Sequence, residues 1–341
     1  MMWYEITGKD SDVVVSSRVR LARNLCDYPF GKRLDETSAR EIIGKVKGVF
    51  DGVCDYRFTD YTSLDPIVKR AEYERHKISR EFANAKTPTA LIESEEKQIY
   101  IMLLEEDHIR IQSIKAGLAL NEAYTAAASA DSLIDSSLKV AYNEKLGYLT
   151  HCPTNLGTGM RASVMMFLPA LTAAGGIRSL QNQLGKLGLT IRGMAGEGSD
   201  SDGCLYQISN QVTLGSSEEE IISKLSEICG KISEQERSLR EKMKEDDTGR
   251  FTDKIMRAYG TMLYATLIDS AELMSLYADV RLGVCLGIID GITPKLLDEI
   301  LVRGMPGVIS CENKGAVNAN RRDRCRAEMV RRVLAGDAKS D

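Results

Sequence analysis

The sequence predicts an α+β domain over roughly residues 13–245, followed by a small all-helical domain over roughly residues 250–335. Two observations carry this prediction. Apolar and β-branched runs of strand length recur through the first part of the chain, whereas helical periodicity dominates after residue 216. Between the two parts, the polar segment DDTGRFTD at 246–253 contains a glycine and is typical of a linker.

Local patterns predict the elements of the first half. Residues 13–24 begin as a β-branched run and predict a strand that leads into basic residues. Residues 34–50 predict a helix, and Thr89–Glu105 predicts two strands around a polar turn, which is a hairpin pattern. From Ile109 through Ala130 isoleucines and leucines mix with alanines, so we expect one long helical region there.

The second half alternates short strands with loops and then becomes helical. LGYLT at 146–150 predicts a strand that runs into a glycine-rich loop, which we expect to precede a helix. Segments 189–194 and 205–213 predict two further strands. Ser217 and Glu220 form a capping-box pattern that opens a helix ending near residue 245. Thr293–Pro294 predicts another helix start, and we expect a last helix over about 320–334.

Composition limits the classes of function. The 341 residues are 43% hydrophobic and 28% charged, as in ordinary globular proteins, and the net charge of −4 provides no global basic field for nucleic acid. Neither a membrane-spanning apolar run nor a signal-peptide pattern is found. The eight cysteines contain no Cys-x-x-Cys pair, which excludes zinc spacing. We therefore expect a cytoplasmic protein that contacts neither membrane nor nucleic acid directly and has no metal ligands of its own.

Five arginines are candidates for a phosphate site, since guanidinium groups suit multidentate binding of phosphate oxygens. Arg18 and Arg20 alternate on a strand and therefore project to one face. Arg110 follows an acidic cluster, Arg161 ends the glycine-rich loop, and Arg192 ends a strand. Taken singly, each is more simply explained as a solvated surface arginine, and the sequence alone does not prove that they converge.

A loop and a run of carboxylates are the other candidate features. The loop CPTNLGTGMR at 152–161 has two glycines that let its backbone approach an anion, but it lacks the ending of a Walker A motif. Glu105, Glu106 and Asp107 are adjacent carboxylates, which suit the binding of a cation such as guanidinium or assistance to a proton transfer. As isolated patterns, an ordinary turn and an acidic strand end or helix start are the commoner explanations.

Together these segments resemble the phosphagen (guanidino) kinase family. SSRVRLAR at 16–23 is similar to that family's arginine-bearing nucleotide strand, EEDHIR at 105–110 to its acidic motif, and 152–161 to its signature loop with a reactive cysteine. The three occur in the family's order. Only fifteen residues precede Ser16, so we expect the family's helical N-terminal domain to be missing, and Leu104 stands where the family usually has Asn.

Over nearly the whole chain the sequence resembles the bacterial protein-arginine kinase branch of that family. The resemblance implies a phosphagen-kinase catalytic domain, glutamine-synthetase-like, with an antiparallel sheet flanked by helices. It implies transfer of the γ-phosphate of ATP, with Mg²⁺, to arginine side chains of proteins. Glu106 is then expected to orient the guanidinium and take its proton, with Cys152 beside the guanidinium and Glu105 and Asp107 helping to hold the site. The nucleotide-binding residues that the resemblance implies, with His76 against the adenine, are Ser16, Ser17, Arg18, Val19, Arg20, His76, Arg110, Arg161, Ala162, Ser163, Val164, Met165, Arg192, Gly193, Met194, Ala195, Gly196 and Glu197.

The last predicted helix carries the sequence RDRCRA, which matches a motif of that branch. Arg322 and Arg326 are four residues apart and share a helix face, although a solvated charged helix would explain the pattern equally well. The resemblance implies an allosteric phosphoarginine site made of Arg322, Asp323, Arg324, Cys325, Arg326 and Ala327. It also implies a homodimer or higher oligomer, a zinc-binding activator, a heat-shock repressor and a Clp unfoldase-protease as partners, and a role in marking proteins for degradation under stress.

Two alternatives stay open from the sequence. A small-molecule guanidino kinase would share the chemistry, but the missing enclosing domain argues against it. A non-catalytic adaptor that binds phosphoarginine is disfavoured because Glu106 and Cys152 are both retained.

Overall fold

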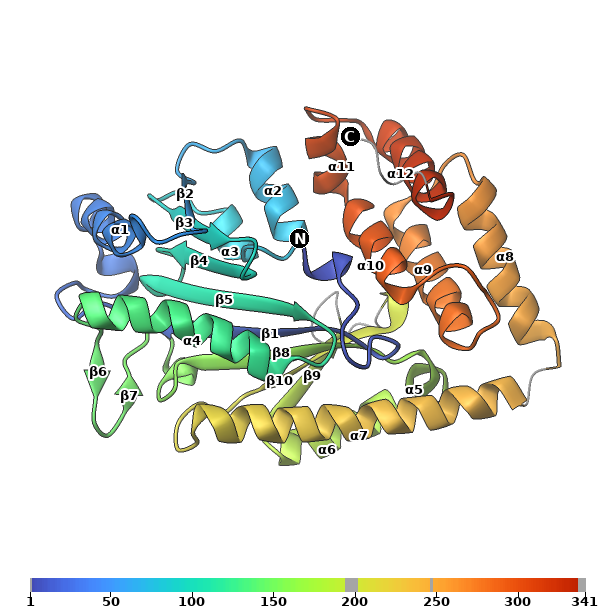
Figure 1. Cartoon of the computed structure of the whole chain (residues 1–341), viewed down its shortest axis with the longest axis horizontal. Helices are drawn as coiled ribbons and strands as arrows, with labels where there is room; N and C mark the ends of the chain where they lie inside the picture. The colour runs from blue at the N-terminus through green and yellow to red at the C-terminus, as the bar shows by residue number, and fades with distance from the viewer. Residues whose placement is uncertain (1, 194–201, 246–247, 337–341) are drawn as a thin grey trace.

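The computed structural model describes residues 2–193, 202–245 and 248–336, which form an α+β structure around one eight-stranded sheet (Figure 1). The strand order is β2-β3-β4-β5-β1-β8-β10-β9, and every neighbouring pair is antiparallel. The strands are β1 (Val14–Arg23), β2 (Arg57–Asp60), β3 (Ala90–Ser94), β4 (Ile99–Leu103), β5 (Ile109–Ala116), β8 (Met160–Phe167), β9 (Leu189–Gly193) and β10 (Leu205–Asn210). A separate two-stranded ribbon consists of β6 (Tyr142–Asn143) and β7 (Gly147–Tyr148).

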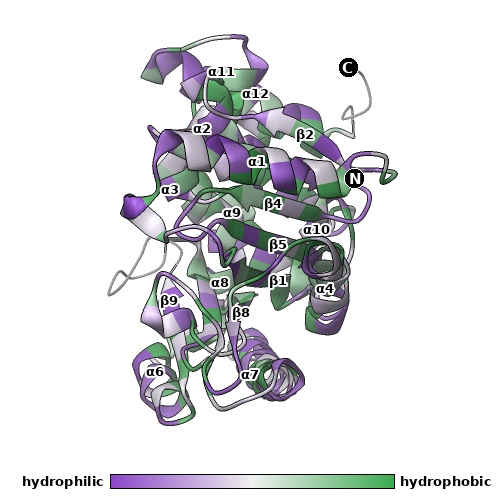
Figure 2. Ribbon diagram, turned by 90° about the vertical axis from the view of Figure 1, so that its left-hand side faces the viewer, coloured by the Kyte–Doolittle hydropathy of each residue, from purple (hydrophilic) through white to green (hydrophobic). Residues whose placement is uncertain are grey.

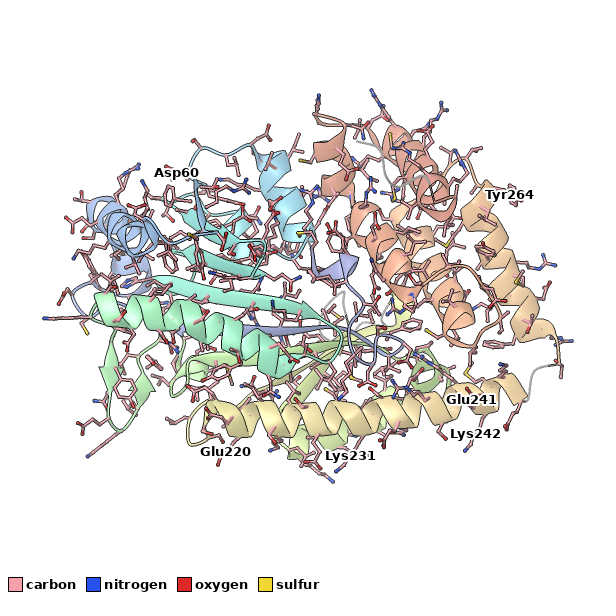
Figure 3. The ribbon with its side chains drawn as sticks, in the orientation of Figure 1. Asp60, Glu220, Lys231, Glu241, Lys242 and Tyr264 are labelled. Carbon is pink, nitrogen blue, oxygen red and sulfur yellow. The ribbon has the colours of Figure 1, made fainter. Side chains whose placement is uncertain are left out.

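One face of the sheet is covered by helices from the first part of the chain. These are α1 (Glu36–Phe50), α4 (Leu120–Ser137), α6 (Ile177–Lys186) and α7 (Glu218–Glu245). Alternate strand residues such as Val19, Ile111 and Val164 pack with these helices in one hydrophobic cluster. The central strands β4 and β5 are accordingly among the most hydrophobic segments in Figure 2. Figure 3 shows that the long helix α7 keeps charged side chains, including Glu220 and Lys231, on its outer side.

The C-terminal helices share a second hydrophobic cluster with the other face of the sheet. Strand residues Tyr100, Met102, Phe167 and Leu205 are buried in this cluster together with side chains of the C-terminal helices and of the N-terminal segment. The C-terminal helices are α8 (Arg250–Tyr264), α9 (Ser270–Cys285), α10 (Pro294–Arg303), α11 (Pro306–Glu312) and α12 (Ala319–Leu334). The short elements η1 (Trp3–Glu5), η2 (Gly31–Arg33), α2 (Pro66–Glu74), α3 (Arg80–Ala83), η3 (Pro153–Asn155), α5 (Pro169–Ala173) and η4 (Asp202–Cys204) complete the described structure.

Most of the predicted elements are confirmed. The expected first strand, the first helix and the hairpin appear as β1, α1 and the β3–β4 pair. The capping box is formed, because Ser217 Oγ accepts from the amide of Glu220 and the Glu220 carboxylate accepts from the amide of Ser217. Thr293 caps α10 through its side chain. The domain limits at 245 and 250 stay predictions, and within the described ranges no helix is both long and apolar enough to cross a bilayer.

Two predictions of helix were wrong. Residues 109–116 form the central strand β5, because Ile109 and Ile111 alternate with Arg110 and pair with β4 and β1 on both sides; helix α4 begins only at Leu120. The glycine-rich loop leads into strand β8 and not into a helix. Most residues of β8 are buried, and the two edges of the strand pair with β1 and β10.

Candidate active site

Arginines from four strands meet on the face of the sheet that also bears the C-terminal helices. We call Arg18, Arg20, Arg110, Arg161 and Arg192 the arginine cluster. Arg18 and Arg20 lie on β1 on either side of the core residue Val19, and Arg20 is directly opposite Arg161 in the pairing of β1 with β8. Arg110 comes from β5 and Arg192 from β9. The alternation predicted for Arg18 and Arg20 therefore places both in one site, and the sheet brings the other three to it.

The charges of the cluster lie close enough to perturb one another. Burial and the charge of Arg110 lower the pKa of Arg18 to about 10. Burial lowers the pKa of Arg20 as well, and the charges of Arg18, Arg110 and Arg161 add to the effect. The pKa of Arg161 is lowered by burial and by Arg192. Partly buried guanidinium groups that lie close enough to repel one another favour a multivalent anion as the ligand.

A polar cavity of about 310 Å³ is lined by members of this cluster. Arg18 Nη2 donates to Gln207 Oε1 at 2.7 Å, and Arg161 Nη2 donates to Thr154 Oγ1 at 3.4 Å. Arg20 Nε is buried and has no hydrogen-bond partner among the described residues. A buried donor without a partner is costly, so this guanidinium is prepared for an acceptor that enters the cavity. The other lining residues include Glu106, Cys152, Asn155 and Ser209.

Arg23 belongs to the same sequence segment but has a structural role. It lies on the opposite face of β1, is only 2% exposed and forms a salt bridge to Asp131 of α4 at 2.7 Å. Its Nη1 donates to the carbonyls of Ala22 and Thr158, and its guanidinium stacks on the Tyr148 ring at 3.4 Å. Arg23 thereby fastens the loop after β7 to β1.

The three adjacent carboxylates occupy different environments in the turn between β4 and β5. Glu105 pairs with Arg110 Nη1 at 2.6 Å and accepts from Ser79 Oγ at 2.7 Å. Asp107 is 1% exposed, and its Oδ1 accepts from Asn24 Nδ2 and from the amide of His151, both at 2.6 Å. These two side chains therefore fix the turn.

Glu106 is the carboxylate that reaches the polar cavity. Its side chain is 39% exposed and lies 3.3 Å from Arg110 Nη2. Burial raises the pKa of Glu106, Arg110 opposes that rise, and the charges of Asp107 and Glu105 add to it. The turn that presents Glu106 begins at Leu104, which has a φ of 65°. Asn adopts this left-handed conformation more readily than Leu, which gives a physical reason for the Asn expected at this position.

The glycine-rich loop places Cys152 beside the same cavity. Cys152 is a partly buried free thiol whose Sγ lies 3.1 Å from Thr154 Oγ1. Thr213 holds the loop, since its Oγ1 donates to the carbonyl of Leu156 at 2.6 Å. Gly159 has a φ of 62°, and a Cβ there would lie 2.7 Å from the carbonyl oxygen of Ala22. A side chain at this position would therefore force the loop away from β1.

A second, more apolar cavity of about 470 Å³ adjoins the first. Arg192 and Gln207 line both cavities. His76 also lines the second cavity, and burial together with the charge of Arg18 lowers the pKa of His76 to about 4, so its ring is neutral near pH 7. The two cavities thus provide a compartment with a mostly apolar lining next to a cationic one.

The remaining nucleotide candidates divide by the face on which they lie. Ser16, Ser163, Met165 and Gly193 line the second cavity. By contrast, the side chains of Val19, Ala162 and Val164 lie on the opposite face of the sheet, in the hydrophobic core. The Ser17 hydroxyl donates to the carbonyl of Gly117. Met194, Ala195, Gly196 and Glu197 lie outside the described residues.

Several residues of the site carried no signal in the sequence. Gln207 and Ser209 are isolated polar residues of β10, and only the register of β10 with β8 and β9 brings them to the cavity. Asn24, which donates to Asp107, has no sequence signal either, because its partner is 83 residues away. Sequence spacing does not reveal such long-range pairs.

The RDRCRA motif lies in α12, outside both cavities. Arg326 is 1% exposed, and its guanidinium donates to the carbonyls of Gly304 and Ile268, to Ser270 Oγ and to Asp323 Oδ1. Ala327 is completely buried, whereas Arg324 is exposed and Asp323 is 28% exposed. Arg322 donates to the carbonyl of Val317, and the Cys325 thiol lies 3.7 Å from Asn313 Oδ1. The motif therefore does not present all six residues to one ligand.

Comparisons with known proteins place this geometry in a family. The family model "ATP:guanido phosphotransferase, C-terminal catalytic domain" matches residues 39–239, and the model "Protein-arginine kinase McsB C-terminal domain" matches residues 248–341. A protein-arginine kinase of Brevibacillus brevis is 40% identical over 97% of this chain and 94% of its own length. One of Desulforamulus reducens is 39% identical, with 97% and 95% covered.

Solved structures show the same fold. A duplicated taurocyamine kinase from Schistosoma mansoni, with bound transition state analog components, has a TM-score of 0.63 and 25% identity; the match covers 79% of this chain and 40% of that one. A lombricine kinase has a TM-score of 0.59 and 24% identity, with 69% of each chain covered. The antiparallel sheet with its helices is thus the catalytic-domain fold of the phosphagen kinases.

Proposed function

This chain belongs to the protein-arginine kinases of the ATP:guanido phosphotransferase family, and on that premise we propose that its arginine cluster holds the triphosphate of ATP while Glu106 holds the target guanidinium. Its activity as a protein-arginine kinase, with ATP as donor and proteins as substrates, follows from that membership. One observation carries the division of roles: four members of the arginine cluster and the single protruding carboxylate, Glu106, line one cavity, and the fifth member, Arg18, lines the adjoining one.

The phosphate side of the reaction needs positioning and charge neutralisation more than covalent help. Guanidinium groups from four strands of a rigid sheet meet that need, because they are already gathered before ATP arrives. Burial and the neighbouring guanidinium charges lower the pKa values of Arg18, Arg20 and Arg161, which supports this role because a polyanion relieves the repulsion. The γ-phosphate then leaves ADP as its bond to the β–γ bridging oxygen breaks and a P–N bond forms to the substrate arginine.

The substrate nitrogen must lose a proton during that transfer. The guanidinium has a pKa of roughly 12.5–13.8 against about 4.3 for an ordinary Glu, so complete removal of the proton before attack would be strongly uphill. Glu106 instead orients the guanidinium and accepts its proton as the P–N bond forms. Its raised pKa narrows the gap and makes it a better base than an ordinary carboxylate. Cys152 would lie next to the guanidinium as a second group of opposite charge when it is ionised.

Magnesium would enter on the nucleotide. Among the described residues, no group of three or more His, Cys, Asp or Glu side chains is arranged to hold a metal ion. Mg²⁺ commonly keeps several waters and binds through substrate phosphates, which requires no such group. Bound in that way, it would neutralise phosphate charge. The chain's own part is to receive the complex with the arginine cluster.

Further assignments rest on the resemblance and on placement. We propose that His76 lies against the adenine and that Met194, Ala195, Gly196 and Glu197 contribute to nucleotide binding. For the C-terminal motif we propose that phosphoarginine contacts Arg322, Asp323 and Arg324, while Arg326 holds Asp323 in place. The same proposal includes a cytoplasmic location, an oligomeric state and a role in marking proteins for degradation under stress. It also includes three partners: a zinc-binding activator, a heat-shock repressor and a Clp unfoldase-protease.

The decisive experiment is incubation with Mg-ATP and an unfolded protein, followed by mass spectrometry under non-acidic conditions, because phosphoarginine is acid-labile. We expect phosphate on arginine side chains, none with Glu106→Ala, and normal transfer with the control Glu227→Ala, whose carboxylate is 65% exposed on α7. Transfer to free arginine alone would instead favour a small-molecule guanidino kinase. Phosphoarginine binding without ATP turnover would favour an adaptor.

A further inference from the structure

The apolar cavity beside His76 has walls from both ends of the chain. Its sheet side is lined by Val15, Ile114 and Met165, among others. The opposite side is lined by Leu301 and Val302 of α10 and by Met305, which follows that helix. Trp3 of η1 also lines this cavity, and η1 packs against α10. Figure 1 shows the N-terminal segment next to α10, over the sheet.

We propose that Trp3 and helix α10 form the wall that recognises the nucleobase of ATP, so that the C-terminal helical region is part of the nucleotide site. This inference rests on the proposed function, in which the arginine cluster holds the triphosphate. A base in the 470 Å³ cavity would leave its phosphates in the cationic cavity, because Arg192 and Gln207 border both spaces. The apolar and cationic compartments match the two halves of a nucleoside triphosphate.

Trp3 supplies a polar group for the base. The side chain is 4% exposed, and its indole Nε1 is buried without a hydrogen-bond partner among the described residues. Buried donors nearly always have partners, and indole N–H can only donate. The ring nitrogens of a nucleobase are acceptors, and a base that reaches this N–H would satisfy it. His76, whose ring centroid lies 5.8 Å from that of Trp3, stays neutral and adds no charge to this compartment near pH 7.

The α10 wall is held in place before any ligand binds. Arg281 of α9 is fully buried and pairs with Asp298 of α10, which also accepts from Tyr277 OH at 2.8 Å. Arg281 Nη2 donates to the carbonyl of Ser11, and this bond ties the N-terminal segment to the same unit. Just after the C-terminal end of α10, the carbonyl of Gly304 accepts from Arg326 Nε at 2.7 Å. The wall is therefore preorganised, and its contribution to binding requires little rearrangement.

Trp3 is the only tryptophan of the chain, so its fluorescence reports on this cavity alone. We would titrate the full-length protein with ADP and, separately, with inorganic tripolyphosphate. ADP is expected to change the Trp3 emission saturably. Tripolyphosphate should compete with ADP, because both need the arginine cluster, but it should leave the emission unchanged because it carries no base.

Two variants and a control then locate the contact, with affinities measured by calorimetry. Trp3→Phe keeps the ring but removes the N–H, and should weaken ADP by about 2–10-fold, the range of one neutral hydrogen bond. Met305→Ala should weaken ADP by about tenfold through lost apolar contact. Both should leave tripolyphosphate affinity unchanged. Met256→Ala, at a 46% exposed position on α8, should change neither affinity.

The outcomes distinguish failure of the nucleobase wall from failure of the proposed phosphate site. Binding of tripolyphosphate together with ADP affinities that are unchanged in Trp3→Phe and Met305→Ala would overturn this inference and leave the phosphate site intact. An emission change with tripolyphosphate equal to that with ADP would overturn it too. Failure of both ligands to bind would remove the arginine cluster as a phosphate site, and the inference with it.

Discussion

Replacing Arg326 with methionine should destabilise the C-terminal helices, whatever ligand the motif binds. The guanidinium is 1% exposed and is the hydrogen-bond donor to two buried carbonyls, those of Gly304 and Ile268. Methionine restores apolar volume but no donor. Each buried acceptor left without a partner costs about 1–3 kcal/mol, so the two carbonyls together predict a loss of about 2–6 kcal/mol. Ser270 Oγ and Asp323 lose a partner as well, but they lie nearer the solvent.

Amide hydrogen exchange is the suitable assay, because a chain of this size need not unfold in a single step and exchange resolves stability by segment. We expect faster exchange in α12, in the last turn of α10 and around Ile268. Arg324→Met is the matched control, since Arg324 occupies the same helix and motif but is exposed. That variant should leave exchange unchanged.

Equal exchange rates in Arg326→Met and Arg324→Met would refute the idea that Arg326 supports the fold. The expected result has a practical consequence for the phosphoarginine proposal. Loss of ligand binding in an Arg326 variant would follow from local unfolding alone, so Arg322 and Arg324 are the positions at which to test ligand contact. Calorimetry with an active-site variant such as Glu106→Ala would keep the two sites apart.

The other predictions concern the catalytic site. Glu106→Gln should lower kcat by about 10²–10⁴-fold and remove the fall of kcat/KM at low pH. In the wild type kcat/KM falls as the Glu106 carboxylate is protonated. Because burial raises the pKa of Glu106, that fall should occur at a higher pH than for an ordinary Glu. A fall that persists in the variant would contradict the assignment. Gly159→Ala should lower the free energy of unfolding by at least about 1–2 kcal/mol, since its φ is 62°. Gly44→Ala, in open space on α1, should not lower it, and thermal unfolding compares the two. By NMR, the His76 ring should protonate only near pH 4. The neutral ring should contribute its full stability above about pH 6.5, the pKa of histidine in the unfolded chain, and this contribution should be lost as the pH falls toward 4. Titration near 6.5 would show that the ring is not desolvated in the cavity.

The sequence predicted the elements whose apolar residues follow either the helical or the strand period, but not both. Strand β1 and the β3–β4 hairpin were recognisable from β-branched runs around a polar turn, and α7 from its capping box. Strand β5 was mistaken for helix because Ile109, Ile111 and Ile114 are spaced by two and then three residues, which fits either period. Tertiary pairing with β4 and β1 decides the outcome there, and no local pattern contains it.

The candidate site was predictable to the same degree. Alternation was enough to place Arg18 and Arg20 on one face of a strand, whereas bringing Arg161 and Arg192 to them needs the order and register of β8, β10 and β9. The three carboxylates looked equivalent in sequence. Only their hydrogen bonds separate Glu106, which reaches the cavity, from its neighbours, which fix the turn. The α10 wall of the apolar cavity is out of reach of local reasoning, because it lies more than 200 residues from His76.

The hydrophobic cluster shared by the sheet and the C-terminal helices bears on how this enzyme can be dissected. Cutting the chain after α7, where one family model gives way to the other, would bare Tyr100, Met102, Phe167 and Leu205 on an open sheet face. An apolar patch of that kind invites aggregation. A truncated kinase that is insoluble or inactive would thus say little about regulation by the removed part. Point substitutions in the intact chain are the sounder way to distinguish the roles of the catalytic part and of the C-terminal helices.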